Sequence, residues 1–144
     1  MEEIAYLAGV IDGEGSITIN KASKGLLRPR IDICSTSKEF LEYLLGIMRK
    51  HGIDTGYFLQ ERKVPKNHKR AYHLIWDTQK NVLKILEKIY PYLFLKRRQA
   101  KIVIDFCKSR LSNGRKRFGK KYSEYELKLY YEIKELNRRG KRWK

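Results

Sequence analysis

The sequence predicts an α+β fold whose elements run helix, strand, strand, helix, strand, strand, helix, with extra helices at the C-terminus. Apolar and polar residues alternate over residues 16–22, 28–35, 57–63 and 70–77, which is typical of strands with one buried face. Apolar residues recur at helical spacing over residues 4–13, 37–52, 79–90, 95–111 and 123–139. With 144 residues the chain is the size of one domain. We divide it into a core over residues 1–95 and a basic helical extension over residues 96–144.

The first predicted helix, residues 4–13, has two unlike faces. Ile4, Leu7 and Ile11 share an apolar face. The opposite side carries only small or short residues, namely Ala5, Gly9, Asp12 and Gly13. Because a glycine within a helix costs about 1 kcal/mol relative to alanine, two of them indicate the close approach of another backbone. Glu14 follows at the electronegative end of the helix, where a bound cation would offset its charge.

The strands predict one apolar face and one polar face. Ile17, Ile19, Ile31 and Ile33 are expected to point inward. In the last strand the bulky residues Tyr72, Leu74 and Trp76 are assigned to the core. The third strand fits two registers, and we favour the one in which Gln60 and Arg62, rather than Tyr57 and Leu59, face outward. The remaining outward positions are Ser16, Thr18, Asn20, Arg28, Arg30, Asp32, His73 and Ile75.

Local signals mark the turns and helix ends. Lys24-Gly25 predicts the turn between the first two strands. Ser37 is the expected N-cap of the second long helix. Ser123 with Glu126 three residues later predicts a capping box at the start of the last helix.

The composition indicates a basic protein with an anionic partner. Lys and Arg total 33 against 16 acidic residues, so the formal net charge is +17. Residues 96–144 hold 18 of the basic and 5 of the acidic residues. Such a charge attracts nucleic acid, and no apolar run is long enough to favour a membrane instead. Cys34 and Cys107 lack metal-ligand spacing, so we expect reduced, buried thiols in an intracellular protein, in the cytoplasm or in an organelle.

Residues 7–15, Leu-Ala-Gly-Val-Ile-Asp-Gly-Glu-Gly, resemble the nine-residue signature of the LAGLIDADG homing endonucleases, with six of nine positions identical. The resemblance implies the family fold, with a saddle-shaped antiparallel sheet. The signature occurs once, and single-signature members of the family are homodimers whose signature helices pack at the two-fold axis. The small-residue face formed by Ala5, Gly9, Asp12 and Gly13 is therefore the expected dimer interface.

The resemblance also implies a metal-dependent reaction. Glu14 matches the acidic metal ligand, where most members carry Asp, and the Gly13 carbonyl is a second ligand for Mg²⁺. Lys96 matches the basic residue near the scissile phosphate, with Arg97 or Arg98 as substitutes, and Ser35 matches a residue that positions solvent. Asp12 is expected to have a structural role at the dimer seam or at a helix end.

The function implied is site-specific cleavage of both strands of a long pseudo-palindromic DNA site. Besides the outward strand residues, the expected DNA contacts are Arg70, Arg97, Arg98, Arg115 and Lys116. Two alternatives stay open: a maturase of the same fold that binds RNA, and a DNA-binding regulator that does not cleave. A basic ribosomal-type RNA-binding protein would explain the charge but not the signature.

Overall fold

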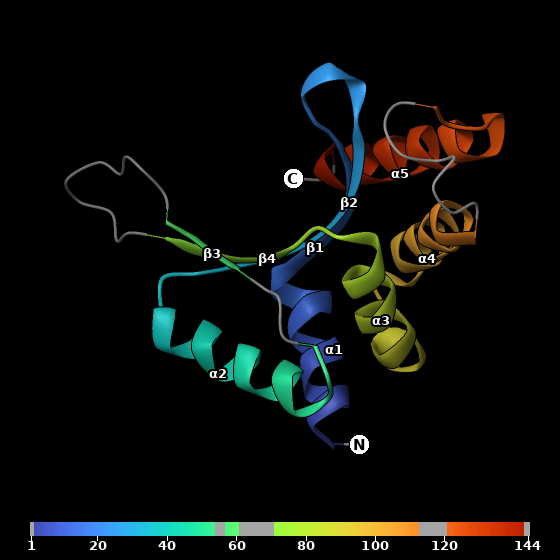
Figure 1. Ribbon diagram of the computed structural model, residues 1–144. Helices are drawn as coiled ribbons and strands as arrows, with labels where there is room; N and C mark the ends of the chain where they lie inside the picture. Colours follow the sequence, from blue (N-terminus) through green and yellow to red (C-terminus); the bar gives the residue numbers. More distant parts are fainter. Residues whose placement is uncertain (1, 54–56, 61–70, 113–120, 143–144) are drawn as a thin grey trace.

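The computed structural model describes residues 2–53, 57–60, 71–112 and 121–142 and shows helices packed on one face of an antiparallel sheet (Figure 1). The elements follow the predicted order, which confirms the α+β fold class. They are α1 (Glu2–Glu14), β1 (Gly15–Lys21), η1 (Ser23–Gly25), β2 (Leu27–Ser35), α2 (Lys38–Lys50), β3 (Tyr57–Gln60), β4 (Tyr72–Trp76), α3 (Gln79–Ile89), η2 (Tyr90–Tyr92), α4 (Arg97–Ser112) and α5 (Glu124–Arg142).

The described sheet has four strands in the order β1-β2-β4-β3, and all neighbours are antiparallel. The β1–β2 hairpin turns through Lys24 and Gly25, whose φ angles are 62° and 79°, so the predicted turn is confirmed. In Figure 1 this hairpin points away from the β3–β4 pair. The sheet is therefore curved, with its helix-free face on the outside of the molecule.

The core lies between the inner face of the sheet and the helices. Ile17 and Ile31, an antiparallel pair at the centre of β1 and β2, are 1% and 0% exposed and confirm the predicted inward set. The same buried cluster includes Phe106 from α4 and Ile133 from α5. The C-terminal helices thus complete the core rather than standing apart from it.

Two further contacts attach the C-terminal region to the hairpin, beside which α5 lies in Figure 1. The Tyr122 hydroxyl accepts a hydrogen bond from the Leu27 amide at 2.7 Å, at the first residue of β2. The Asn137 side chain on α5 donates to the Ile17 carbonyl at 3.4 Å. These bonds hold the hairpin against the helices.

The predicted helix caps are present. The Ser37 hydroxyl accepts from the Phe40 amide at 3.1 Å, as expected of an N-cap. Ser123 and Glu126 form the reciprocal capping box, with distances of 3.0 Å from the Ser123 amide to Glu126 Oε1 and 3.1 Å from the Glu126 amide to Ser123 Oγ. The first helix is longer than predicted, because Glu14 is its last residue rather than the residue that follows it.

Three sequence predictions about strand positions are wrong. Ile75 shares the outer face of the sheet with its partner Asp32, but it is only 1% exposed and is therefore not the open position that was predicted. Gln60 pairs with Tyr72, a residue of the inner set, so β3 has the register that we did not favour; shifting a strand by one residue exchanges its two faces. Cys34 is exposed, because it follows Asp32 on the outer face of β2.

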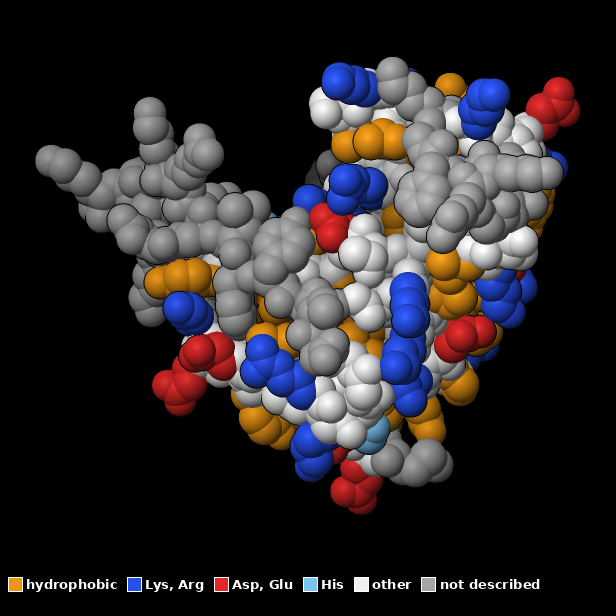
Figure 2. Space-filling view, in the orientation of Figure 1, with side chains coloured by type: hydrophobic (Ala, Val, Ile, Leu, Met, Phe, Trp, Pro, Cys, Tyr) orange, Lys and Arg blue, Asp and Glu red, His pale blue; other side chains and the backbone are white. Residues whose placement is uncertain are grey.

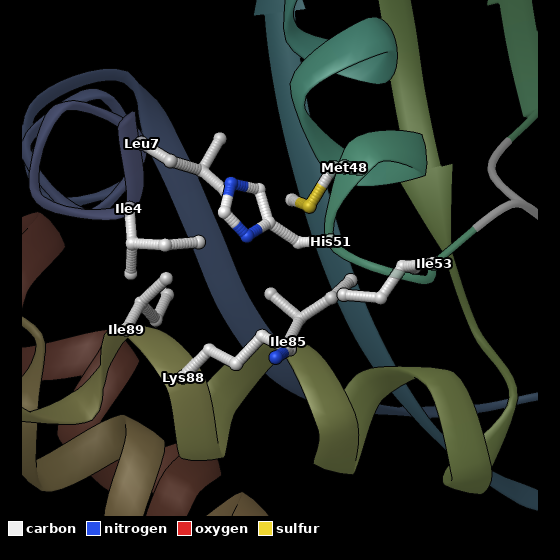
Figure 3. A pocket seen from close by; sticks show the side chains of 8 residues that line it. All are labelled: Ile4, Leu7, Met48, His51, Ile53, Ile85, Lys88 and Ile89. Carbon is white, nitrogen blue, oxygen red and sulfur yellow. The ribbon is translucent and has the colours of Figure 1, made fainter. Parts of the chain in front are cut away.

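A small apolar recess lies among α1, α2 and α3 (Figure 3). It has no room for a water molecule, and its lining is mostly aliphatic: Ile4, Leu7, Met48, His51, Ile53, Ile85, Lys88 and Ile89. The His51 ring is held by Glu3, with 3.3 Å between Nε2 and Oε1. The recess is a packing seam of the helical layer, lined from the first two turns of α1, whereas Glu14 is at the other end of that helix.

Candidate functional site

The C-terminal end of α1 leads directly into the sheet. Glu14 ends the helix and is exposed, and Gly15 begins β1 opposite Ile33. A Cβ atom on Gly15 would lie 3.0 Å from the Ile11 carbonyl oxygen and 3.3 Å from that of Asp32. A side chain at Gly15 would press on backbone atoms, so glycine suits this tight junction, which places Glu14 at the end of the sheet.

Asp12 binds the segment that precedes α4. One carboxylate oxygen accepts from the Phe94 amide at 2.6 Å, and the other accepts from the Lys96 amide at 2.9 Å. The carboxylate therefore satisfies backbone donors at the start of α4, although Asp12 is 84 residues from Lys96 in the chain. This is the helix-end role that the sequence left open for Asp12.

The Lys96 side chain turns back onto the same residue. Its ammonium group donates to the Asp12 carbonyl at 2.6 Å and is half-buried. Burial lowers the pKa of Lys96, while the negative charges of Asp12 and Glu14 oppose that shift. The fold thus brings the predicted acid and the predicted base of the site close enough to interact electrostatically.

Ser35 lies at the same end of the sheet. It is two residues beyond Ile33, the partner of Gly15, and is the last residue of β2. Its hydroxyl oxygen accepts from the Ser37 amide at 3.0 Å, at the start of α2. The hydroxyl group is thereby fixed at the α2 N-terminus.

The sequence pattern of the LAGLIDADG-like domain matches residues 1–90. The chain belongs to the LAGLIDADG family. No curated protein matches it by sequence. The family assignment confirms the resemblance drawn from residues 7–15.

Solved structures agree with this assignment. The homing endonuclease I-CvuI in complex with its target in the presence of Ca is 25% identical, with a TM-score of 0.59, and the match covers 94% of this chain and 95% of that one. I-CvuI in complex with the I-CreI target in the presence of Mg, with the DNA not cleaved, is 28% identical, with a TM-score of 0.57 and coverage of 78% and 69%. An archaeal intron-encoded homing endonuclease complexed with DNA, I-Vdi141I, shares the fold at 21% identity, with a TM-score of 0.69 and coverage of 93% and 83%.

In this LAGLIDADG chain the outer face of the sheet carries the polar rows that the sequence predicted. Directly opposite partners are Ser16 with Asp32, Thr18 with Arg30, and Asn20 with Arg28. Their side chains are exposed or half-buried. Basic side chains spread over the face shown in Figure 2, including its upper end, where the hairpin lies.

Two of these outer residues on β2 form polar contacts, one with a residue of β4 and one with the residue that follows β4. His73 Nδ1 is 2.9 Å from Asp32 Oδ1, and Arg28 Nη1 is 4.0 Å from Asp77 Oδ2. The sequence did not reveal these pairs, because the order of β2 and β4 in the sheet had to be known first. Both pairs limit the orientations that the outer side chains adopt.

The signature helix α1 leaves its small face uncovered. Gly9 and Gly13 are exposed, and a Cβ atom added at either position meets nothing within 4 Å. Large apolar side chains are exposed on α1 and just before α4: Tyr6 at 47%, Phe94 at 84% and Leu95 at 68%. Phe94 is joined to α1 through Asp12.

The donor atoms near Glu14 fit a hard divalent cation by type. Carbonyls in the last turn of a helix, such as that of Gly13, have no partner within the helix. Carboxylate and carbonyl oxygens are the ligands that Mg²⁺ prefers, with water and phosphate oxygens completing its shell. No cluster of three His, Cys, Asp or Glu side chains suited to a metal exists in the described part of the chain. One chain therefore offers Glu14 and Gly13 as a partial ligand set.

The other predicted DNA contacts are in three different situations: one is held within the chain, one is exposed and four lie outside the described residues. Arg97 is held within the chain, since its Nε donates to the Leu93 carbonyl at 3.1 Å and its guanidinium lies 5.7 Å from the centre of the Tyr90 ring. Arg98 is exposed on the first turn of α4. The remaining predicted contacts lie outside the described residues: Arg62, Arg70, Arg115 and Lys116.

Proposed function

We propose that this protein is a homing endonuclease that acts as a homodimer and makes a double-strand break in a long pseudo-palindromic DNA site by Mg²⁺-dependent phosphodiester hydrolysis. The observation that carries the proposal is the contact of the Lys96 ammonium with the Asp12 carbonyl at 2.6 Å, because Asp12 is two residues before Glu14 at the end of α1. A carboxylate for the metal and an ammonium for the phosphate are thus placed beside a polar face that is suited to DNA.

The chemistry divides among three groups of this chain. Glu14 and the Gly13 carbonyl hold the Mg²⁺ ion, which when bound activates a water molecule and neutralises charge on the phosphate. The Lys96 ammonium stabilises the negative charge that develops at the scissile phosphate. Ser35, at the same end of the sheet, orients solvent through its hydroxyl group.

Recognition is assigned to the outer face of the sheet. Arg28 and Arg30 suit guanine, Asn20 suits adenine, and Ser16 and Thr18 accept or donate. The family relatives support this assignment, since I-CvuI was crystallised with its target DNA. No helix in the described part of the chain has the length and apolar character needed to cross a membrane.

A homodimer is supported by the number of carboxylates that the reaction needs. One chain carries one signature and therefore one Glu14, whereas two strands must be cut. Packing the open Gly9–Gly13 face of two copies together would bring two Glu14 carboxylates to one axis. A two-fold protein reads a pseudo-palindromic site.

The test is cleavage of a randomised or intron-junction DNA library with Mg²⁺ by the wild-type protein and by Glu14→Gln. We expect the wild type to cut both strands at a discrete site and the variant to bind that site with unchanged affinity but not to cut it. The amide keeps the shape of the side chain but removes the charge that holds the metal. Nicking by the variant at the wild-type rate would contradict the role of Glu14.

Binding measured in Ca²⁺ serves as the control in that experiment. Tight DNA binding without a cut in Mg²⁺ or Mn²⁺ would contradict the nuclease assignment and favour the non-cleaving regulator. Tight RNA binding together with inactivity on DNA would favour the maturase.

A further inference from the structure

We propose that Asp12 is a positioning residue, which holds the Lys96 ammonium beside Glu14 by fixing both ends of the lysine. The inference rests on the proposed function, in which Lys96 faces the scissile phosphate. It assigns to the sixth residue of the signature a task that is separate from metal binding and from the dimer seam.

The evidence is a closed set of bonds between two residues. The Asp12 carboxylate accepts from the Lys96 amide at 2.9 Å, and the Asp12 carbonyl accepts from the Lys96 ammonium at 2.6 Å. The second carboxylate oxygen accepts from the Phe94 amide at 2.6 Å, which fixes the turn leading into Lys96. The backbone and the tip of one lysine are thus bound by the same partner.

This arrangement explains how a lysine is stabilised next to the N-terminal end of α4. Lys96 immediately precedes α4, whose N-terminal end disfavours a cation and favours an anion. The Asp12 carboxylate supplies the anion at that end. The C-terminal carbonyls of α1 form the electronegative end of the other helix, and they receive the ammonium. Two helix ends of opposite polarity therefore meet, with Asp12 and Lys96 between them.

The arrangement also restricts the lysine side chain. Lysine has a flexible four-carbon stem, so an ammonium group attached only at its Cα would sample many positions. Because Asp12 is two residues from Glu14 on the same helix, a lysine bound to Asp12 stays at the end of the helix that carries Glu14. Displacement of a reacting group by about 1 Å costs roughly a hundredfold in rate.

The primary variant is Asp12→Asn, which keeps the size of the side chain but accepts only one of the two amide protons. We expect its kcat for DNA cleavage to fall roughly tenfold to a hundredfold, with the DNA dissociation constant in Ca²⁺ unchanged. Asp12→Ser, whose hydroxyl accepts one amide proton, is the second variant should Asp12→Asn not fold. Asp105→Asn is the matched control, because Asp105 lies on α4 away from Asp12 and binds the exposed Lys101 at 3.1 Å.

A double-mutant cycle separates positioning from general stability. In a Lys96→Ala background we expect Asp12→Asn to cause no further loss of kcat, because there is no ammonium left to position. An equal loss of kcat in both backgrounds would overturn the proposal. A loss of DNA affinity that accounts for the whole defect would overturn it as well.

Hydrogen exchange of the Phe94 and Lys96 amides gives a readout that does not need activity. We expect both amides to exchange faster in Asp12→Asn than in the wild type or in Asp105→Asn. A wild-type protein that cuts no DNA would refute the proposed function. The exchange comparison would still decide whether Asp12 holds Lys96, and equal exchange rates would overturn that.

Discussion

At the scale of single residues, the two cysteines show how position changes one chemical group. Cys107 is buried in α4, and burial raises the pKa of its thiol to about 12. Cys34 is exposed on β2, opposite His73 on the proposed DNA face. The sequences around the two cysteines are similar, so their different exposure arises because Cys34 occupies an outward-facing position of β2.

This difference predicts selective labelling. A maleimide reagent at neutral pH should modify Cys34 but not Cys107 in the folded protein, because the reagent reaches only the exposed thiol and burial raises the pKa of Cys107. The bulky product should prevent DNA binding, and bound DNA should protect Cys34 from the reagent. Mass spectrometry with a gel-shift assay measures both effects, with Cys34→Ser as the unlabelled control. Full affinity of the labelled protein would place the DNA on another surface.

At the scale of elements, α1 combines a buried face with an open one. Leu7 and Ile11 are within 1% of complete burial, whereas Gly9 and Gly13 face open space. Among the described residues, no atom lies close enough to require glycine at these two positions. The proposed second copy packed against α1 would account for their small size.

Gly9→Leu should therefore leave the fold intact and prevent dimerisation. Leucine is the better helix former by up to about 1 kcal/mol, and a Cβ atom added at Gly9 meets no described atom within 4 Å. We expect native circular dichroism, a sedimentation mass of one chain, and loss of double-strand cleavage. Gly46→Leu is the matched control, because Gly46 on α2 also has nothing within 4 Å of an added Cβ. A dimeric Gly9→Leu protein would rule out this interface.

The contact between α4 and α5 depends on a buried charge. Glu126 and Arg110 have 0% and 6% exposure, with 3.2 Å between Oε1 and Nη1. Burial opposes ionisation of Glu126. However, hydrogen bonds from Ser109 and the Ser123 amide, with the charge of Arg110, outweigh it and hold the pKa of Glu126 below its usual value of 4.5.

Glu126→Gln should lower the free energy of unfolding by about 3 kcal/mol, the lower end for a buried ion pair that loses a partner. Arg110 keeps its bond to the Lys121 carbonyl, which limits the loss. Ser123→Ala, which removes only the cap, should cost about 1 kcal/mol. Urea titration measures both.

The lowered pKa of Glu126 also gives the sign of the pH dependence. The stabilisation is complete above pH 4.5 and is lost as the pH falls through the folded pKa. The difference in the free energy of unfolding between wild type and Glu126→Gln should therefore become smaller at acidic pH. An equal difference at every pH would contradict the role of the charge.

At the scale of the whole molecule, the net charge of +17 makes DNA binding an electrostatic process. Each phosphate neutralised contributes a slope of about −0.9 to the logarithmic dependence of affinity on salt. We expect affinity for a target duplex to fall by roughly a thousandfold between 50 and 200 mM salt, as measured by fluorescence anisotropy. An unrelated duplex of equal length is the control. Affinity independent of salt would contradict binding through the phosphate backbone.

The sequence by itself determined the order of the elements, the caps at Ser37 and Ser123, the turn at Lys24-Gly25 and the family signature. These features depend on residues close together in the chain, where periodicity and hydrogen-bonding side chains act locally. The candidate acid Glu14 was predicted from the same local signal, and Lys96 from resemblance alone.

Only the tertiary structure decided which residues from distant parts of the chain lie next to one another. The register of β3, the burial of Ile75 and the contact of His73 with Asp32 depend on which strands are neighbours and how they are aligned, which no local pattern encodes. The bonds from Asp12 to Phe94 and Lys96 join residues more than eighty positions apart. Such contacts form because burying the apolar faces of α1, α4 and the sheet in one core brings distant polar groups together.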